Sequence, residues 1–203
     1  INSIFSPIYL TNDNIIIKII NIIAVIPARC GSKSVPQKNI RDIGNHPLIA
    51  YTIALAKMSK MIERVIVSTD SAEIADIAVK YGAEVPFMRP SEFAQDDSGD
   101  FEWLKHLIDY LEKKESTSAK YLVHLRPTTP FRKVKIVENG IKYISENPNA
   151  TSLRSVSTLS NPVQKLFKME GPYLVGFFDN DLRPEYYNLP RQAFPQTYIP
   201  NGY

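Results

Sequence analysis

The stretch IIAVIPARCGSKSVPQKN, residues 22–39, predicts both the type of fold and the position of a binding site. Residues 22–26 form a short apolar run rich in β-branched side chains, and Pro27 follows directly. Such a run is typical of a buried strand in a parallel sheet. The polar loop after it holds a glycine followed by serine and lysine. Backbone N–H groups and a cation at that place favour the binding of a phosphate.

The rest of the chain continues with alternating strands and helices. The sequence predicts further strands at residues 65–68, 85–88 and 121–125, and helical patterns lie between and after them. At least four such alternations call for an α/β fold of three layers, with helices on both faces of a mostly parallel sheet. Ligands bind such sheets beyond the carboxyl ends of the strands.

Local signals predict where the helices begin and end. Pro47 suits the first residue of one helix, and Asp70 with Glu73 has the spacing of a capping box at the next. Gly82 is well placed to end that second helix, and Ser98 suits the cap of a third. The predicted buried side of the third helix carries Phe101, Leu104, Ile108 and Leu111, and a fourth helix carries Val137, Ile141 and Ile144.

Composition narrows the classes of function. The net charge of +3, from 24 basic and 21 acidic residues, is too small to favour nucleic acid and fits a small anionic substrate. The single cysteine, Cys30, excludes an internal disulfide and indicates a reducing compartment, as in the cytoplasm. Residues 1–20 are too interrupted by polar side chains for a membrane span, and we interpret them as an N-terminal extension.

The chain changes character after Asn147. Residues 151–200 are rich in proline, asparagine and aromatic residues, with a predicted strand at residues 152–156. We expect this C-terminal excursion to form a subunit contact or an arm that covers the substrate.

Five segments carry a family resemblance. They are residues 27–39; the Ser-Thr-Asp at 68–70; VPFMRPSEFAQDDS at 85–98; LRPTTPFR at 125–132; and, near the end, Arg191-Gln192 with Pro195 and Asn201-Gly202. In this order they resemble the motifs of the CMP-sialic acid synthetases, or acylneuraminate cytidylyltransferases. Each motif is moderately specific, whereas five in the right order are a strong indication.

The resemblance implies a Rossmann-like fold of the nucleotide-diphospho-sugar transferase type over residues 21–203, lacking its C-terminal end. It implies a homodimer that transfers a cytidylyl group from CTP to an acidic nine-carbon sugar and releases pyrophosphate, assisted by Mg²⁺, for polysaccharide biosynthesis. The family's pair of metal-binding aspartates lies beyond its Asn-Gly mark, which here is residues 201–202. The metal ligands are therefore unknown.

The resemblance also implies a set of site residues. Arg29, Lys33 and Lys38 are the expected catalytic cations, because phosphoryl-type transfer depends on alignment and charge neutralisation. The nucleotide site is expected to contain Ala28, Arg29, Ser32, Lys33, Lys38, Asn39, Arg89 and Ser98, with Asn39 and Arg89 reading the cytosine. The sugar site is expected to contain Arg126, Thr128, Lys165, Arg191 and Gln192.

Two residues depart from the family pattern, and two others are expected to have structural rather than catalytic roles. Arg126 replaces a usual glutamine at a position that the family uses near the sugar, and Asp100 stands where the family frequently has a serine close to the nucleotide. Asp70 is expected to cap its helix rather than bind metal, and Trp103 to pack in the core.

Two alternative functions remain. One is a cytidylyltransferase for another acidic sugar such as ketodeoxyoctonate, against which Lys33 and Asn39 argue. The other is a non-catalytic module that binds nucleotide without releasing pyrophosphate.

Overall fold

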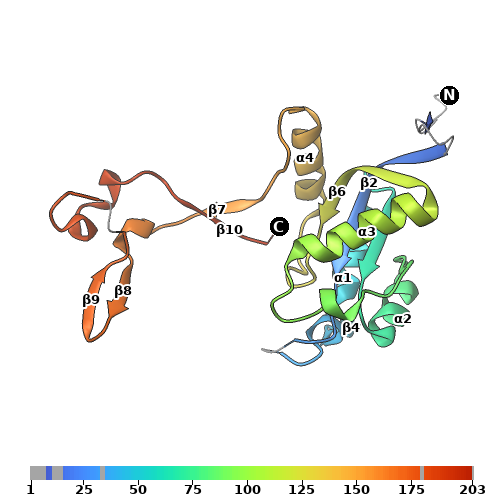
Figure 1. Cartoon of the computed structure of the whole chain (residues 1–203), viewed down its shortest axis with the longest axis horizontal. Coiled ribbons are helices and arrows are strands. Elements are labelled where there is room, and N and C mark those ends of the chain that lie inside the picture. Colours follow the sequence, from blue (N-terminus) through green and yellow to red (C-terminus); the bar gives the residue numbers. More distant parts are fainter. Residues whose placement is uncertain (1–7, 11–15, 33–34, 179–180, 203) are drawn as a thin grey trace. The chain divides into compact units, whose positions relative to one another are not determined.

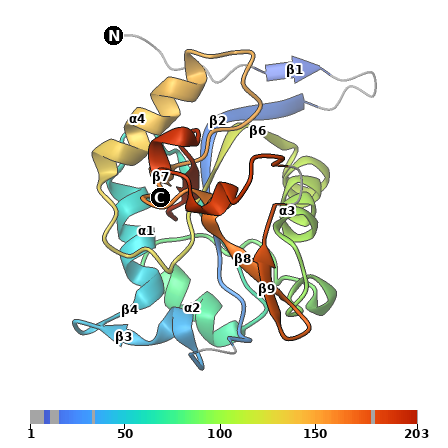
Figure 2. The same cartoon turned by 90° about the vertical axis from the view of Figure 1, so that its left-hand side faces the viewer.

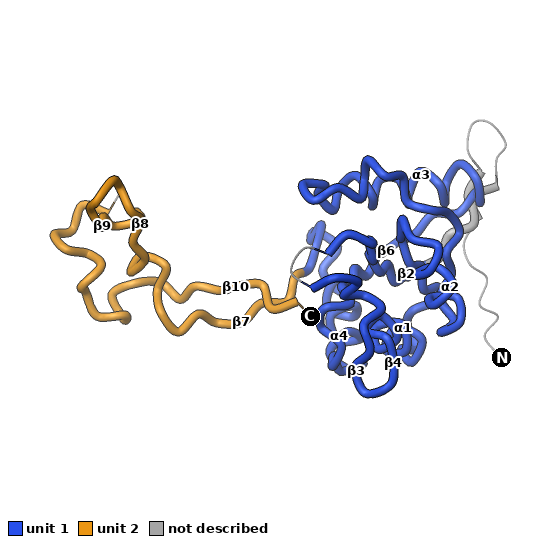
Figure 3. Tube along the Cα trace, turned by 90° about the horizontal axis from the view of Figure 1, so that it is seen from below, with its two compact units in different colours: residues 1–153 blue, residues 154–203 orange. Residues whose placement is uncertain are grey.

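The computed structural model describes residues 8–10, 16–32, 35–178 and 181–202. Lys33 of the expected nucleotide site lies outside these described residues. The chain divides into two compact units, residues 1–153 and residues 154–203 (Figure 3). Among the described residues, no helix is both long and apolar enough to cross a membrane.

The first unit is built on a sheet whose central strand is β2 (Ile16–Pro27). β2 pairs in parallel with β5 (Arg64–Ser68) and β6 (Thr117–His124), and antiparallel with β1 (Ile8–Leu10). In this register Pro27 faces Ser68, and Val25 faces both Ile66 and His124. The carboxyl ends of the three parallel strands therefore meet at one edge of the sheet. β2 begins at Ile16, within the segment that the sequence assigned to an extension.

Helices cover both faces of this sheet, so the predicted three-layer α/β architecture is confirmed. Figure 2 shows α3 (Asp100–Glu115) on one side of the sheet and α1 (Leu48–Met58) and α4 (Val134–Ser145) on the other. Successive side chains of β2 alternate between two cores, as the pleat of a strand requires. Ala24 and Ile26 pack with α1 and with α2 (Ala72–Lys80), while Ile23 and Val25 pack with α3.

Short elements complete the first unit. The loop after β2 contains a 3-10 turn at Lys38–Ile40, followed by the small hairpin β3 (Asp42–Ile43) and β4 (His46–Pro47). A second 3-10 turn at Ser91–Phe93 precedes α3.

The strand predicted at residues 85–88 is wrong. Only a single parallel bridge forms there, between Glu84 and Ile66, in which the Glu84 amide donates to Val65 and its carbonyl accepts from Val67. Pro86 has no backbone N–H to donate and so cannot extend the ladder. The chain instead turns along the end of β5, where the amide of Arg89 donates to the carbonyl oxygen of Thr69 at 2.7 Å.

Two predicted helix caps are also wrong. Ser71 caps α2 by accepting from the Ile74 amide, and Asp70 is turned towards the loop after β2 instead. Gly99 rather than Ser98 precedes α3. The predicted end of α2 is confirmed, because Gly82 follows it with a φ of 90°, a conformation that suits glycine.

The buried side of α3 agrees only in part with the predicted one: Leu111 is buried and Leu104 packs against the core as expected, whereas Phe101 and Ile108 do not. Trp103, Leu107 and Leu111 are buried, whereas Phe101 is 74% exposed and Ile108 is 39% exposed. Both stripes have helical spacing, so periodicity alone did not separate them. Contact with Ile23 and Val25 of β2 decides which side packs inward.

The second unit is made of two antiparallel pairs and short turns. β7 (Val156–Thr158) pairs with β10 (Tyr198–Pro200), and β8 (Phe167–Glu170) forms a hairpin with β9 (Tyr173–Gly176). The strand predicted at residues 152–156 thus begins only at Val156. Figure 1 labels these strands. The predicted role of this unit in dimerisation stays a prediction.

Candidate active site

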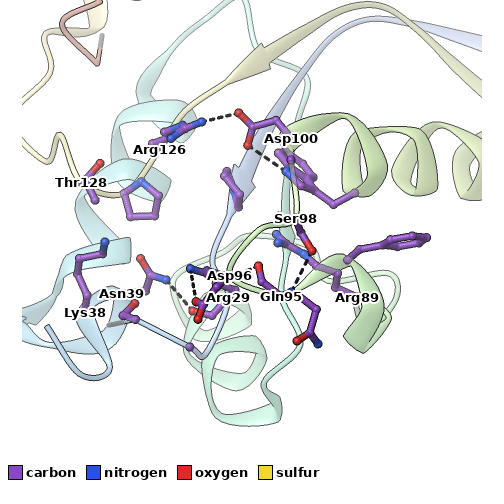
Figure 4. A pocket seen from close by; sticks show the side chains of 17 residues that line it. Arg29, Lys38, Asn39, Arg89, Gln95, Asp96, Ser98, Asp100, Arg126 and Thr128 are labelled. Atoms are coloured by element: carbon purple, nitrogen blue, oxygen red, sulfur yellow. Dashed lines mark hydrogen bonds and ion pairs between the residues drawn. The ribbon is translucent and has the colours of Figure 1, made fainter. Parts of the chain in front are cut away.

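A cavity of about 580 Å³ lies in the first unit, at the edge where the parallel strands end. Its walls come from stretches far apart in the sequence, within residues 27–32, 38–39, 89–103 and 126–128. Figure 4 shows the side chains that line it. The location agrees with the rule that ligands bind beyond the carboxyl ends of parallel strands.

The loop after β2 is fastened to the end of β5. The Ala28 amide donates to the Ser68 carbonyl oxygen at 3.0 Å, and the Cys30 amide donates to Oδ1 of Asp70 at 2.7 Å. Nδ2 of the buried Asn39 donates to the Arg29 carbonyl oxygen at 3.0 Å and closes the loop on itself. Asp70 therefore shapes the predicted phosphate loop, a role that the sequence did not reveal.

The Arg29 side chain lines the cavity and contacts residues 94–96. Its Nη1 donates to the carbonyl oxygens of Ala94 and Gln95 at 3.2 and 2.6 Å. Its Nη2 lies 3.0 Å from Oδ1 of Asp96. A bound phosphate group would thus compete with Asp96 for this guanidinium.

Arg89 is built into the end of β5. It is 6% exposed, its Nε donates to Oγ of Ser68 at 3.0 Å, and its Nη2 donates to the Ser68 carbonyl oxygen at 2.6 Å. The guanidinium lies 5.1 Å from the ring centre of Trp103. Burial lowers the pKa of Arg89 to about 10, against the opposing charge of Asp70, so the side chain is charged at neutral pH.

Ser98 organises the segment before α3. Its hydroxyl accepts from the Gln95 amide at 3.0 Å and donates to the Glu92 carbonyl oxygen at 3.1 Å. These bonds fold the segment that presents Asp96 to Arg29. Ser98 also lines the cavity, where the sequence placed it.

An arginine and an aspartate face each other at a separate part of the cavity wall. Nη2 of Arg126 donates to Oδ2 of Asp100, and the Trp103 indole donates to Oδ1 of the same carboxylate at 3.2 Å. Partial burial raises the pKa of Asp100, but the bond from Trp103 and the charge of Arg126 outweigh it, so this pKa lies below its ordinary value. The carboxylate is therefore charged at neutral pH.

The structure brings together most of the expected site residues of the first unit. The cavity is lined by Arg29, Ser32, Lys38, Asn39, Arg89, Ser98, Arg126 and Thr128. Ala28 is fully buried and contributes its backbone.

Three residues expected at the sugar site, Lys165, Arg191 and Gln192, belong to the second unit. Arg191 and Gln192 line a separate cavity of about 440 Å³ within that unit.

Some lining residues were missed by the sequence. Phe93 and Gln95 lie in a segment whose turns have no periodic signal, and Trp103 was expected only to pack. The one available signal was the spacing of Asp100 and Trp103, three residues apart on a helix and hence on one face.

The described part of the chain holds no preformed cluster of metal ligands. It contains no group of three or more His, Cys, Asp or Glu side chains arranged to hold an ion. In the cavity, Asp96 and Asp100 are each paired with an arginine. We therefore assign no step to the Mg²⁺ that the resemblance implied.

The chain is similar to known proteins whose names include cytidylyltransferases and CMP-sugar synthases. The CMP-N,N′-diacetyllegionaminic acid synthase of Legionella pneumophila is 41% identical over 68% of this chain and 59% of its own length. The N-acylneuraminate cytidylyltransferase of Escherichia coli is 36% identical over 89% of this chain and 41% of its own. The pseudaminic acid cytidylyltransferase of Campylobacter jejuni is 30% identical over 89% of this chain and 75% of its own. The chain thus spans about half the length of the first two relatives.

Solved structures share the fold at low identity. A CMP:2-keto-3-deoxy-manno-octonic acid synthetase in complex with CTP matches 68% of this chain and 51% of its own, with a TM-score of 0.52 and 24% identity. A 4-diphosphocytidyl-2C-methyl-D-erythritol synthase matches 76% of this chain and 66% of its own, with a TM-score of 0.56 and 12% identity. Residues 23–175 match the family described as cytidylyltransferase, and the chain belongs to that family.

Proposed function

We propose that the protein carrying this chain transfers the cytidylyl group of CTP to a nonulosonic acid, an acidic nine-carbon sugar. One observation carries the proposal: segments separated by up to about a hundred residues bring Arg29, Lys38, Arg89 and Arg126 to one cavity at the sheet edge. Relatives at 30–41% identity, named for legionaminic, neuraminic and pseudaminic acids, support the class of acceptor.

The proposed reaction exchanges a phosphoanhydride bond for a phosphoester bond. The anomeric hydroxyl oxygen of the sugar attacks the α-phosphorus, the bond from that phosphorus to the β-phosphate oxygen breaks, and pyrophosphate leaves. The hydroxyl proton is released to solvent or to a base. Such a transfer requires charge neutralisation and alignment rather than covalent catalysis. Arg29 and Lys38 are the cations proposed to hold the triphosphate and the departing pyrophosphate, with Lys33 of the same loop as a third.

We call Arg29, Lys38, Asn39 and Arg89 the nucleotide end of the cavity. Asn39 uses Nδ2 within the loop, which leaves its carbonyl oxygen as the acceptor for a cytosine amino group. Arg89 uses Nε and Nη2 on Ser68, so Nη1 is the nitrogen proposed to face the base. The bonds already made orient both groups before a ligand arrives.

We call Asp100 and Arg126 the acceptor end of the cavity. In Figure 4 they lie apart from Lys38, Arg29 and Arg89. Thr128 also lines the cavity and is proposed to contact the sugar. Lys165, Arg191 and Gln192, a homodimer and a cytoplasmic location stay predictions.

The test is pyrophosphate release by the full-length natural protein with CTP, Mg²⁺ and a panel of nonulosonic acids, with ketodeoxyoctonate as the comparison acid. We expect release with at least one nonulosonic acid and little with ketodeoxyoctonate, and a parallel assay with EDTA measures the Mg²⁺ dependence. Preference for ketodeoxyoctonate would favour the alternative acceptor. CTP binding without release from any acid would favour the non-catalytic module.

A further inference from the structure

The acceptor end consists of two charged side chains from different elements. Asp100 is the first residue of α3, and Arg126 follows β6, 26 residues later in the chain. They form an ion pair whose side chains are 42% and 54% exposed, and both line the cavity. The pair is therefore accessible to a ligand in the cavity, and Figure 4 shows the two side chains facing each other.

Asp100 is also held from its other side. The indole of Trp103, which is 2% exposed, donates to Oδ1, while Arg126 donates to Oδ2. A carboxylate with a donor on each oxygen has a defined orientation, and the buried ring transfers that orientation to the arginine. Arg126 itself is an exposed side chain whose four-bond stem would otherwise sample many rotamers.

The pair offers donors and acceptors without net charge. A guanidinium has five N–H donors, and an ionised carboxylate has about four lone-pair positions. Asp100 accepts one hydrogen bond from Arg126 and one from Trp103. Further lone-pair positions on the carboxylate and further N–H donors on the guanidinium are therefore left for a ligand. A carboxylate ligand can only accept and would also approach the charge of Asp100, whereas an amide or hydroxyl group both donates and accepts.

We propose that Asp100 is a positioning residue for Arg126, and that the Asp100–Arg126 pair binds a neutral substituent of the acceptor sugar, an acylamino or hydroxyl group, rather than its carboxylate. This inference rests on the proposed function. It assigns to these two residues the selection among acids that share a carboxylate but differ in their neutral substituents.

The first experiment measures binding of the sugar without turnover. The full-length protein is saturated with the CTP analogue that has a methylene group between the α- and β-phosphorus atoms, and the preferred acid is titrated by calorimetry. We expect Arg126→Ala and Asp100→Ala each to weaken sugar binding about 10-fold, as for loss of a hydrogen bond to a charged group. The double variant is expected to bind no more weakly than Arg126→Ala, because the two residues act as one unit.

Two controls test whether the loss of sugar binding arises at the Asp100–Arg126 pair. Asp97→Ala removes an exposed carboxylate from the same segment and is expected to leave the sugar Kd unchanged. Trp103 is the one tryptophan of the sequence and donates to Asp100, so its fluorescence reports on this end of the cavity. The sugar-dependent change in fluorescence is expected in the wild-type protein and lost in Arg126→Ala.

The second experiment identifies the group that the pair binds. The acid is compared with its methyl ester and with an analogue that lacks one acylamino or hydroxyl substituent. We expect the preference for the acid over the ester to be equal in wild type and in Arg126→Ala. The preference for the acid over the analogue should fall towards one in Arg126→Ala, for at least one substituent.

The outcomes separate this inference from the proposed function. A preference over the ester that disappears in Arg126→Ala would assign the carboxylate to Arg126 and overturn the inference. Pyrophosphate release by the wild type, with an unchanged sugar Kd in Arg126→Ala or Asp100→Ala, would overturn the inference alone. Neither release nor sugar binding by the wild type would overturn the proposed function together with it.

Discussion

Arg89 at the nucleotide end of the cavity and Arg126 at the acceptor end are held in opposite ways. At the nucleotide end, Arg89 is 6% exposed and is bonded to the backbone and side chain of Ser68 in β5. At the acceptor end, the Arg126 side chain is 54% exposed and pairs with a carboxylate from a helix. One arginine is thus part of the packed sheet edge, while the other depends on a single partner side chain.

Because of this difference, we expect Arg89 to affect mainly the stability of the fold, and Arg126 to affect mainly the selection of the ligand. A change at Arg89 leaves buried acceptors unsatisfied and so affects folding, whereas a change at Arg126 or Asp100 affects chiefly the ligand. Under the proposed function, the choice of acceptor can therefore change while the nucleotide end stays as it is. The predictions below test this separation, beginning with the largest expected effect.

Lys38→Ala should disable the nucleotide end without unfolding the protein. Lys38 is a partly exposed loop residue that lines the cavity, and the loss of one stabilising charge in transfer chemistry costs about 100- to 1000-fold in rate. We expect that loss in kcat/KM for CTP in the pyrophosphate assay, with an unchanged unfolding midpoint. Lys80→Ala, on the exposed end of α2, is the matched control. Near-normal activity of Lys38→Ala would contradict its assignment to the triphosphate.

Arg89→Ala should lower the free energy of unfolding by about 3 kcal/mol, because it removes a buried side chain and two bonds to Ser68. Arg126→Ala is the comparison and should change this free energy by less than about 1 kcal/mol, since its ion pair is exposed. Urea unfolding of both variants measures the difference. Equal losses would refute the separation of the two ends. If enough Arg89→Ala folds, its preference for CTP over UTP should also weaken.

Asp96→Asn should strengthen CTP binding by a few-fold. Asp96 occupies Arg29 with an ion pair of partly exposed groups, and such pairs contribute about 0.2 to 1 kcal/mol. Asp97→Asn removes the same charge at the next residue and should leave the affinity nearly unchanged, which excludes a general effect of net charge. Calorimetry measures the binding of CTP to both variants. Weaker binding of CTP to Asp96→Asn than to wild type would contradict the proposed competition between Asp96 and phosphate for Arg29.

The smallest effect is expected for the pH dependence of stability, through a histidine that packs behind the cavity residue Phe93. His106 of α3 contacts the rings of Phe87 and Phe93, with centroids 4.6 and 5.9 Å away. Burial lowers the pKa of His106 below 6.5; the neighbouring charges act in smaller measure, Asp109 and Glu92 raising it and Arg89 lowering it. The folded protein therefore holds this proton less tightly than the unfolded chain.

The contribution of His106 to stability is full above pH 6.5 and declines as pH falls from there towards the lowered pKa. We expect wild type to lose more unfolding free energy than His106→Gln between pH 7.5 and 5.5, measured by urea unfolding. Parallel losses in both proteins would contradict the lowered pKa.

The sequence predicted the elements that local signals define. The run at residues 22–26 forms part of the central strand β2. A short apolar run rich in β-branched residues is typical of a strand that is buried on both faces. The end of α2 at Gly82 was likewise confirmed. Family motifs also singled out Arg29, Ser32, Lys38, Asn39, Arg89 and Ser98, which the structure brings to one cavity, and their role in binding a nucleotide stays a prediction.

Only the tertiary structure decided the pairing of elements and of side chains. It ended the strand pairing beside β5 at Glu84, and it left Phe101 exposed on α3. It also joined two departures from the family pattern, Asp100 and Arg126, into one ion pair. Sequence by itself determines spacing along a strand or helix, because that spacing follows from local backbone geometry. Contacts between residues 26 positions apart depend on which strand and which helix the whole core places side by side.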